Sequence, residues 1–218
     1  SLGSYTLTFS KSNYNDTSLS TNLETDNQSI TANVTLLADT CSSGTVAGTI
    51  TDAVSGNGVA DVSLSVRSGL STTSGSTTGT TTTTASNGTY TISSMSAGAY
   101  TVEASKDDYI TTYFNVNICG SLTDQDTNIS EELSSGTMRI VLHWGANSGL
   151  TIVDSHLTGP DNSSGRFHIY WPTASQKFFY QTNDYTCSGC SSSQKSDNVT
   201  LDKDDTSAPG TETITIPG

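Results

Sequence analysis

The sequence predicts an all-β protein made of tandem β-sandwich domains. Apolar and polar residues alternate in short segments bounded by Gly, Asn, Asp or Ser, which is typical of strands joined by tight turns. Helical periodicity is nearly absent. Turn signals lie at Val54–Gly58 and Ser86–Gly88, because Asn and Gly accept a positive φ.

The expected strands follow one another along the whole chain. The alternating apolar sets are Tyr5-Leu7-Phe9, Ile30-Ala32-Val34-Leu36, Val59-Val62-Leu64-Val66, Tyr90-Ile92, Tyr100-Val102-Ala104, Phe114-Val116-Ile118 and Ile214-Ile216. The low-complexity tract 71–84 is expected to begin as a loop. Its Thr run is expected to end as a strand, because β-branched residues favour an extended backbone.

The start of the chain recurs later in the sequence. Residues 2–14 align with residues 97–109, with Gly, Tyr, Thr, Ser, Lys and Tyr at the same spacing. Strand-like sequence precedes the second copy, whereas only two residues precede Gly3. We therefore expect residues 1–40 to be the closing half of a module that is incomplete within the chain, with open strand edges. Residues 41–120 are expected to be a complete copy, 121–135 a polar, acidic linker and 136–218 a different β-sandwich domain.

Composition limits the classes of function. Lys and Arg number 8 against 21 Asp and Glu, giving a net charge of −13, and both nucleic acid and anionic membranes require a basic face. The 36 Ser and 38 Thr residues give a surface hydrated by hydroxyl groups, which is typical of secreted or cell-surface proteins. No stretch approaches the ~20 apolar residues of a membrane helix. We therefore expect an extracellular protein without nucleic-acid partners or membrane insertion.

The four cysteines are expected to form two structural disulfides. Cys41 stands just before the complete module and Cys119 just after it, which suits a clamp on its ends. Cys187 and Cys190 lie in a Ser-rich loop, without the βαβ context of a redox site or the further ligands of a zinc site. Disulfides of this kind persist in an oxidising compartment.

The central module carries five signatures in order: Gly48–Ala53, Gly58–Val62, Thr84–Tyr90, Ala97–Val102 and Lys106–Tyr109. In this order they resemble the carboxypeptidase regulatory-like domain, a transthyretin-like β-sandwich, over residues 44–118. The resemblance implies a non-catalytic accessory module that acts as a fold stabiliser, spacer or adhesive unit. No GxSxG, HExxH, P-loop or dinucleotide-binding motif is present either. We predict that the chain is not an enzyme and has no organic cofactor.

The last domain carries five motifs in order: Ile140–Gly145, Val153–Pro160, Arg166–Tyr170, Leu201–Asp205 and Glu212–Ile214. These motifs resemble an extracellular bacterial or archaeal β-domain with a WG…DSHLxGP pattern. Ile152 stands where that pattern has its first Asp, and residues 209–212 read Pro-Gly-Thr-Glu in place of Gly-Pro-Glu-Thr.

One polar constellation suggests a metal site. Its members are Asp154, His156, Asp202, Asp204, Asp205 and Glu212. Carboxylates brought together across strands repel one another unless a cation lies between them, and Ca²⁺ accepts 6–8 oxygen ligands in irregular geometry. The alternative is that these carboxylates bond to backbone N–H groups in turns.

The sequence also leaves open two ways in which the chain could carry or bind carbohydrate. Trp171 and Tyr180 would suit a sugar-binding platform, or packing at a sheet edge or subunit contact. Asn-x-Ser/Thr sequons, which would accept N-linked glycans, begin at Asn15, Asn27, Asn33, Asn87, Asn128, Asn162 and Asn198.

The half module leads to the functional hypothesis of a homopolymeric extracellular fibre. Residues 1–40 would add strands to an identical neighbouring subunit, or accept strands from it, in a head-to-tail contact that propagates. The expected contact residues are Tyr5, Leu7, Phe9, Val34 and Leu36. The alternatives are a fragment of a multidomain surface adhesin, whose last domain binds a ligand with or without Ca²⁺, and the accessory region of a secreted hydrolase.

Overall fold

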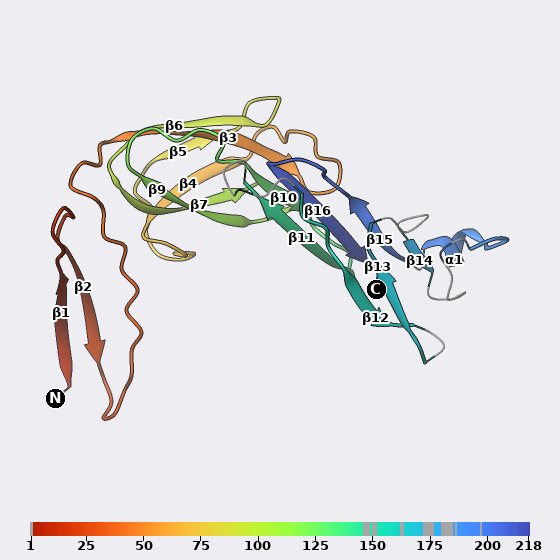
Figure 1. The fold of residues 1–218 in the computed structure, drawn as a ribbon, viewed down its shortest axis with the longest axis horizontal. Helices are drawn as coiled ribbons and strands as arrows, with labels where there is room; N and C mark the ends of the chain where they lie inside the picture. Colours follow the sequence, from red (N-terminus) through yellow and green to blue (C-terminus); the bar gives the residue numbers. More distant parts are fainter. Residues whose placement is uncertain are drawn as a thin grey trace.

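The computed structural model describes residues 2–145, 149, 152–161, 164–171, 177–179, 185, 187–196 and 198–218. It confirms the predicted all-β fold class, because the described residues form sixteen strands and one short helix, α1 (Ser192–Ser196). The strands form three units that follow one another along the molecule (Figure 1).

The central unit is a sandwich of two four-stranded sheets. One sheet has the strand order β6-β3-β10-β8 and the other β5-β4-β7-β9. Its strands are β3 (Gly44–Asp52), β4 (Ser63–Ser68), β5 (Thr81–Thr83), β6 (Thr89–Met95), β7 (Gly98–Ser105), β8 (Tyr109–Ile110), β9 (Thr112–Ile118) and β10 (Thr127–Glu131).

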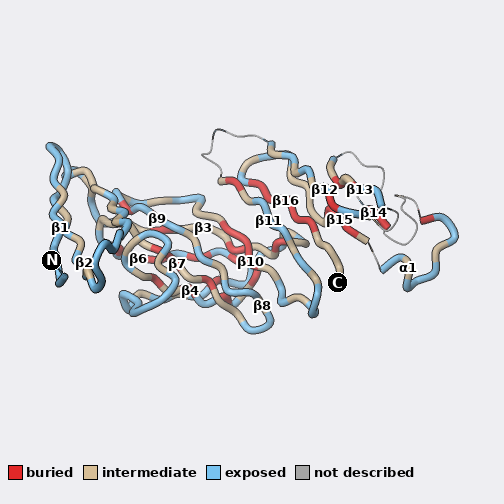
Figure 2. The backbone as a smooth tube through the Cα atoms, turned by 90° about the horizontal axis from the view of Figure 1, so that it is seen from below, coloured by how far each residue is buried: buried red, intermediate tan, exposed pale blue. Residues whose placement is uncertain are grey.

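The core of this sandwich follows from the two-residue period of a strand. In β4, Leu64 and Val66 are fully buried, while Ser63 on the other face is exposed and Ser65 and Arg67 are half-buried. Val102 on β7 lies opposite Val66 and is also fully buried. Ile50 of β3 belongs to the same apolar core. Figure 2 shows these buried segments running through the middle of the central unit.

The segment 121–135, predicted as a linker, contains a core strand. β10 pairs in parallel with β3, placing Thr127 opposite Ile50, and Ile129 is fully buried. Its polar neighbours are accommodated by hydrogen bonds, for example from Asn128 Nδ2 to Thr51 Oγ1 at 2.7 Å. The central sandwich therefore extends past residue 120, because β10 pairs with β3 and adds a fully buried side chain to the core.

Two disulfides are present. The Cys41–Cys119 bond joins the chain just before β3 to the chain just after β9, across a separation of 78 residues. The Cys187–Cys190 bond closes a loop with a separation of 3 residues.

The N-terminal hairpin consists of β1 (Gly3–Phe9) and β2 (Thr17–Leu23), which pair antiparallel and form a two-stranded sheet of their own. The following segment 30–36, expected to be a strand from its alternation, makes no strand ladder in the structure. It follows the hairpin at one end of the molecule (Figure 1), and nearby Asn15 N donates to Leu37 O at 2.8 Å.

The C-terminal unit has a four-stranded sheet of order β11-β16-β15-β14, and a two-stranded sheet, β12-β13. Its strands are β11 (Met138–Trp144), β12 (Leu157–Pro160), β13 (Arg166–Ile169), β14 (Lys177–Phe179), β15 (Asn198–Lys203) and β16 (Gly210–Ile216). Phe167 and Ile169 of β13 pack with Val199, Leu201 and Ile214 of the larger sheet.

Side-chain hydrogen bonds connect the C-terminal unit to the central sandwich. Thr213 Oγ1 donates to Ala53 O at 2.5 Å, and Thr211 Oγ1 donates to Asn128 Oδ1 at 3.0 Å. All four of these residues are buried. β16 therefore has the apolar core of the C-terminal unit on one side and the central sandwich on the other.

Candidate functional site

The N-terminal hairpin exposes apolar side chains on a strand with a free edge. β1 pairs only with β2 among the described strands, so its outer edge carries unpaired backbone groups. Leu7 is 41 % exposed although it lies opposite Leu19 of β2. Figure 2 shows that most of the hairpin backbone is exposed.

The structure distributes the five predicted contact residues between two environments. Tyr5 and Leu7 are exposed on β1, whereas Phe9 at the end of that strand is half-buried. Val34 and Leu36 are half-buried in the segment that follows the hairpin. The apolar surface available to a partner is therefore mainly that of β1.

A second exposed apolar edge, which sequence analysis missed, lies on β11. Met138, Ile140 and Leu142 lie opposite Ile216, Ile214 and Glu212, and so face the core side of the sheet. Ile214 is 2 % exposed, but Ile140 beside it is 40 % exposed. The core side of the sheet is therefore covered over β16 and open over β11. The sequence signal was the run Ile140-Val141-Leu142, which is apolar on both faces of an edge strand.

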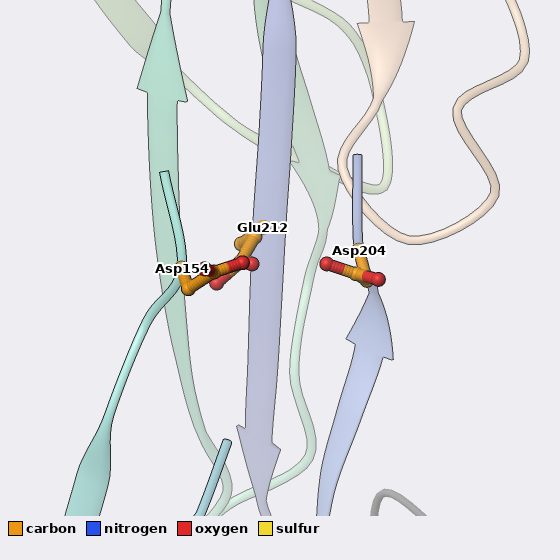
Figure 3. A group of neighbouring side chains, drawn as sticks. All are labelled: Asp154, Asp204 and Glu212. Carbon is orange, nitrogen blue, oxygen red and sulfur yellow. The ribbon is translucent and has the colours of Figure 1, made fainter. Parts of the chain in front are cut away.

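Three of the six residues predicted for a metal site come together. Ligand oxygens of Asp154, Asp204 and Glu212 all lie within 4.8 Å of one another. They come from three segments: the chain before β12, the chain just after β15, and β16. Figure 3 shows the three side chains beside one another.

A β-bulge in β15 brings Asp204 to this position. Leu201 pairs with Ile214, but Lys203 pairs with Thr213, so Asp202 is the extra residue of the bulge. In a regular ladder Lys203 would lie opposite Glu212 on the core side. With the bulge, Lys203 lies with Thr213 on the side of the sheet that faces the central sandwich, and the alternation of side chains turns Asp204 to the side of Glu212.

The carboxylates of the cluster lie close together and partly buried, which is unfavourable unless a cation or a proton lies between them. Glu212 is 1 % exposed, and its Oε2 accepts a 2.5 Å hydrogen bond from Ser155 N. Burial raises the pKa of Glu212; the Ser155 contacts lower it, and the Asp204 carboxyl raises it again. Among the described residues, the buried oxygens Glu212 Oε1, Asp204 Oδ1 and Ser155 Oγ have no hydrogen-bond partner.

The other three predicted ligands have partners elsewhere. Asp202 accepts hydrogen bonds from Thr200 Oγ1 and Thr215 Oγ1, each at 2.5 Å. Asp205 pairs with Lys203 at 2.7 Å and accepts from Thr211 N at 2.8 Å.

His156 lies away from the carboxylates in a histidine pair. Its Nδ1 is 2.9 Å from His168 Nε2, and both rings stack on Tyr170. Six residues in a sequence pattern thus separate into a carboxylate cluster, two structural carboxylates and an aromatic stack.

Of the predicted sugar platform, Trp171 is 50 % exposed and Tyr180 lies outside the described residues. No helix among the described residues is long and apolar enough to cross a membrane.

Comparison with known proteins identifies the class of the central unit. Residues 45–130 match the family model of the carboxypeptidase regulatory-like domain, which confirms the resemblance of that module and extends it through most of β10. The resemblance of residues 136–218 to a WG…DSHLxGP-type domain stays a prediction. No curated protein matches the chain.

Solved structures with partial similarity include three pilins. A streptococcal ancillary pilin is 15% identical, with a TM-score of 0.32, covering 60% of this chain and 42% of that one. The minor pilin GBS52 of Streptococcus agalactiae is 12% identical, with a TM-score of 0.31, covering 57% of this chain and 56% of that one. The major pilin SpaD of Corynebacterium diphtheriae is 12% identical, with a TM-score of 0.32, covering 79% and 56%. The chain thus spans about half of the length of these proteins.

Proposed function

We propose that the chain is a non-enzymatic extracellular structural subunit that forms a fibre by head-to-tail strand addition. In this contact the outer edge of β1 in one copy pairs with the outer edge of β11 in the next copy. The observation that carries the proposal is the exposed apolar surface on two edges without a partner among the described strands, at Leu7 on β1 and at Ile140 on β11.

The hairpin has a physical reason to take a partner. An isolated two-stranded hairpin is marginally stable in water, and further strands or a covering layer are needed for independent stability. β1 and β2 form a sheet by themselves, with Leu7 and Leu19 paired across it. Added strands would satisfy the backbone groups of the β1 edge and bury its apolar side chains.

The positions of the two edges suit a polymer. The hairpin lies at one end of the long axis of the molecule and the C-terminal unit lies toward the other end (Figure 1). A contact between two different surfaces does not close on itself unless its rotation closes a ring, so it propagates. Met138, Ile140 and Leu142 would gain side-chain neighbours from the strand added beside β11.

The remaining features support an extracellular setting. The described cysteines form two disulfides, which persist in oxidising compartments. The net charge of −13 disfavours nucleic acid and anionic membranes. The central unit matches a domain family that the sequence resemblance associates with accessory rather than catalytic roles.

Two charged substitutions test the proposal. Leu7→Lys on β1 and Ile140→Glu on β11 should each abolish polymers, because a charge buried at a strand interface costs several kcal/mol. A mixture of the two variants retains one intact pair of edges: β1 of the Ile140→Glu chain and β11 of the Leu7→Lys chain. We therefore expect each variant alone to be monomeric, and the mixture to associate through this intact pair. Light scattering after size-exclusion chromatography measures these masses, and electron microscopy shows fibres of the unaltered chain.

Ile110→Lys is the matched control, since Ile110 is 46 % exposed on β8, outside both edges. This variant should form fibres like the unaltered chain. Fibres from Leu7→Lys or Ile140→Glu alone would contradict the proposed contact. An unaltered chain that stays monomeric at high concentration would contradict assembly itself.

A further inference from the structure

We propose that Asp154, Asp204 and Glu212 bind a Ca²⁺ ion that ties the chain before β12 to strands β15 and β16. This inference is independent of fibre assembly, because the cluster lies within one chain and is complete without a neighbour.

The first argument is that buried carboxylate oxygens lack hydrogen-bond partners. Glu212 is 1 % exposed, and its Oε1 has no partner among the described residues; the same holds for Asp204 Oδ1. A buried charge without a partner costs several kcal/mol, and buried acidic groups are normally paired or bound to a metal. The ion pairs among the described residues are Arg67–Glu103 and Lys203–Asp205, so no basic side chain neutralises the cluster.

The second argument is the local fold. The bulge at Asp202 turns Lys203 away from Glu212 and directs Asp204 toward it. A regular ladder would have placed the ammonium group of Lys203 on the side of Glu212 and removed the conflict. The observed ladder instead brings a second carboxylate to the buried one, an arrangement that a divalent cation stabilises.

The spacing and the donor atoms favour Ca²⁺ among the common cations. All donors are oxygens, which suit Ca²⁺ and Mg²⁺ rather than zinc or copper. Two oxygens on one ion lie at most twice the metal–oxygen distance apart, about 5 Å for Ca²⁺ and about 4 Å for Mg²⁺. One oxygen from each of the three carboxylates lies within 4.8 Å of the other two, which is inside the span of a Ca²⁺ ion. Ser155 Oγ, which is buried without a partner, is a further oxygen beside Glu212, and water would complete the 6–8 ligands.

A bound ion would hold in place the segment that leads into β12. Asp154 is exposed, whereas Glu212 is held between buried residues of β16. A shared ion would fix the exposed segment to the sheet in addition to the single Ser155 N–Glu212 Oε2 hydrogen bond. Extracellular Ca²⁺ modules bind with dissociation constants of about 10⁻⁴–10⁻³ M, and we expect a value in that range.

Calorimetric titration of the EDTA-treated full chain with CaCl₂ tests the site. We expect one ion per chain. Asp154→Asn and Glu212→Gln should each weaken binding by at least about tenfold, because each removes one charged ligand. Asp107→Asn removes the same charge from a turn of the central unit and should bind like the unaltered chain. Mg²⁺ should bind at least about tenfold more weakly than Ca²⁺.

Thermal unfolding gives a second readout that separates a metal site from a merely structural cluster. In EDTA, Glu212→Gln should unfold at the same temperature as the unaltered chain or higher, because it removes an unpaired buried charge. Added Ca²⁺ should raise the unfolding temperature of the unaltered chain and of Asp107→Asn, but not of Asp154→Asn or Glu212→Gln. No Ca²⁺ heat and no thermal shift in the unaltered chain would overturn the proposal. Ca²⁺ binding by Asp154→Asn and Glu212→Gln as tight as that of the unaltered chain would overturn it too.

Discussion

Replacing Cys41 and Cys119 together by Ala is expected to lower the free energy of unfolding by about 4.5 kcal/mol. The disulfide closes a loop with a sequence separation of 78 residues that contains most of the central sandwich. In the chain-entropy description, removing such a constraint frees the unfolded chain in proportion to the logarithm of loop length. Urea unfolding without reductant, followed by far-UV circular dichroism, measures the loss.

The second disulfide is the matched control. Cys187 and Cys190 are three residues apart, and the same description gives about 1.6 kcal/mol for their replacement. Both tryptophans, Trp144 and Trp171, belong to residues 136–218, so their fluorescence reports on the C-terminal unit. The Cys41/Cys119 variant should shift the dichroism transition more than the fluorescence transition. Equal losses from the two disulfides would contradict the loop-length argument.

The fold class was predictable because the alternation of side chains is visible within one strand. Leu64 and Val66 alternate with polar residues in the sequence, and the structure buries both of them. The turn at Ser86–Gly88 was predictable for the same local reason: Gly88 has a φ of +81°, and a Cβ there would lie 2.4 Å from Ile50 O. In the turn signal at Val54–Gly58, the residue with a positive φ is Gly56, at +72°.

Features that depend on a distant partner were not predictable. Ile30 and Val34 alternate like a strand, but none of the described strands pairs with them. The edge position of β11, and hence the exposure of Ile140, depends on strand order in the sheet, which alternation does not encode.

In the candidate metal site, too, the local features were predictable and those that depend on strand pairing were not. The acidic residues were evident in the sequence, but a bulge decides which of them converge. With Asp202 as the extra residue, Asp204 reaches Glu212 while Asp202 turns to Thr215. A shift of one residue in a strand exchanges its two faces, so no reading of residue types alone could separate these two aspartates.

β10 leads to the second large expected effect. Residues 121–135 read as a polar linker because Ile129 is accompanied by Thr, Asn, Ser and Glu. In the structure Ile129 is fully buried between the sheets of the central sandwich. Ile129→Ala is therefore expected to lower the free energy of unfolding by about 2–5 kcal/mol, the usual cost of truncating a buried aliphatic side chain. A residue in a true linker would change it by less than about 0.5 kcal/mol.

Ile110→Ala provides the same truncation on the neighbouring strand. Ile110 of β8 lies opposite Ser130 of β10 but is 46 % exposed, so its replacement leaves little cavity and should cost well under half as much. Urea unfolding of the two variants, followed by far-UV circular dichroism, compares them directly. A loss for Ile129→Ala no larger than that for Ile110→Ala would mean that β10 is not an integral strand of the sandwich. A larger loss for Ile129→Ala would mean that the core of the central sandwich depends on β10. The domain then ends after β10 and not at residue 120.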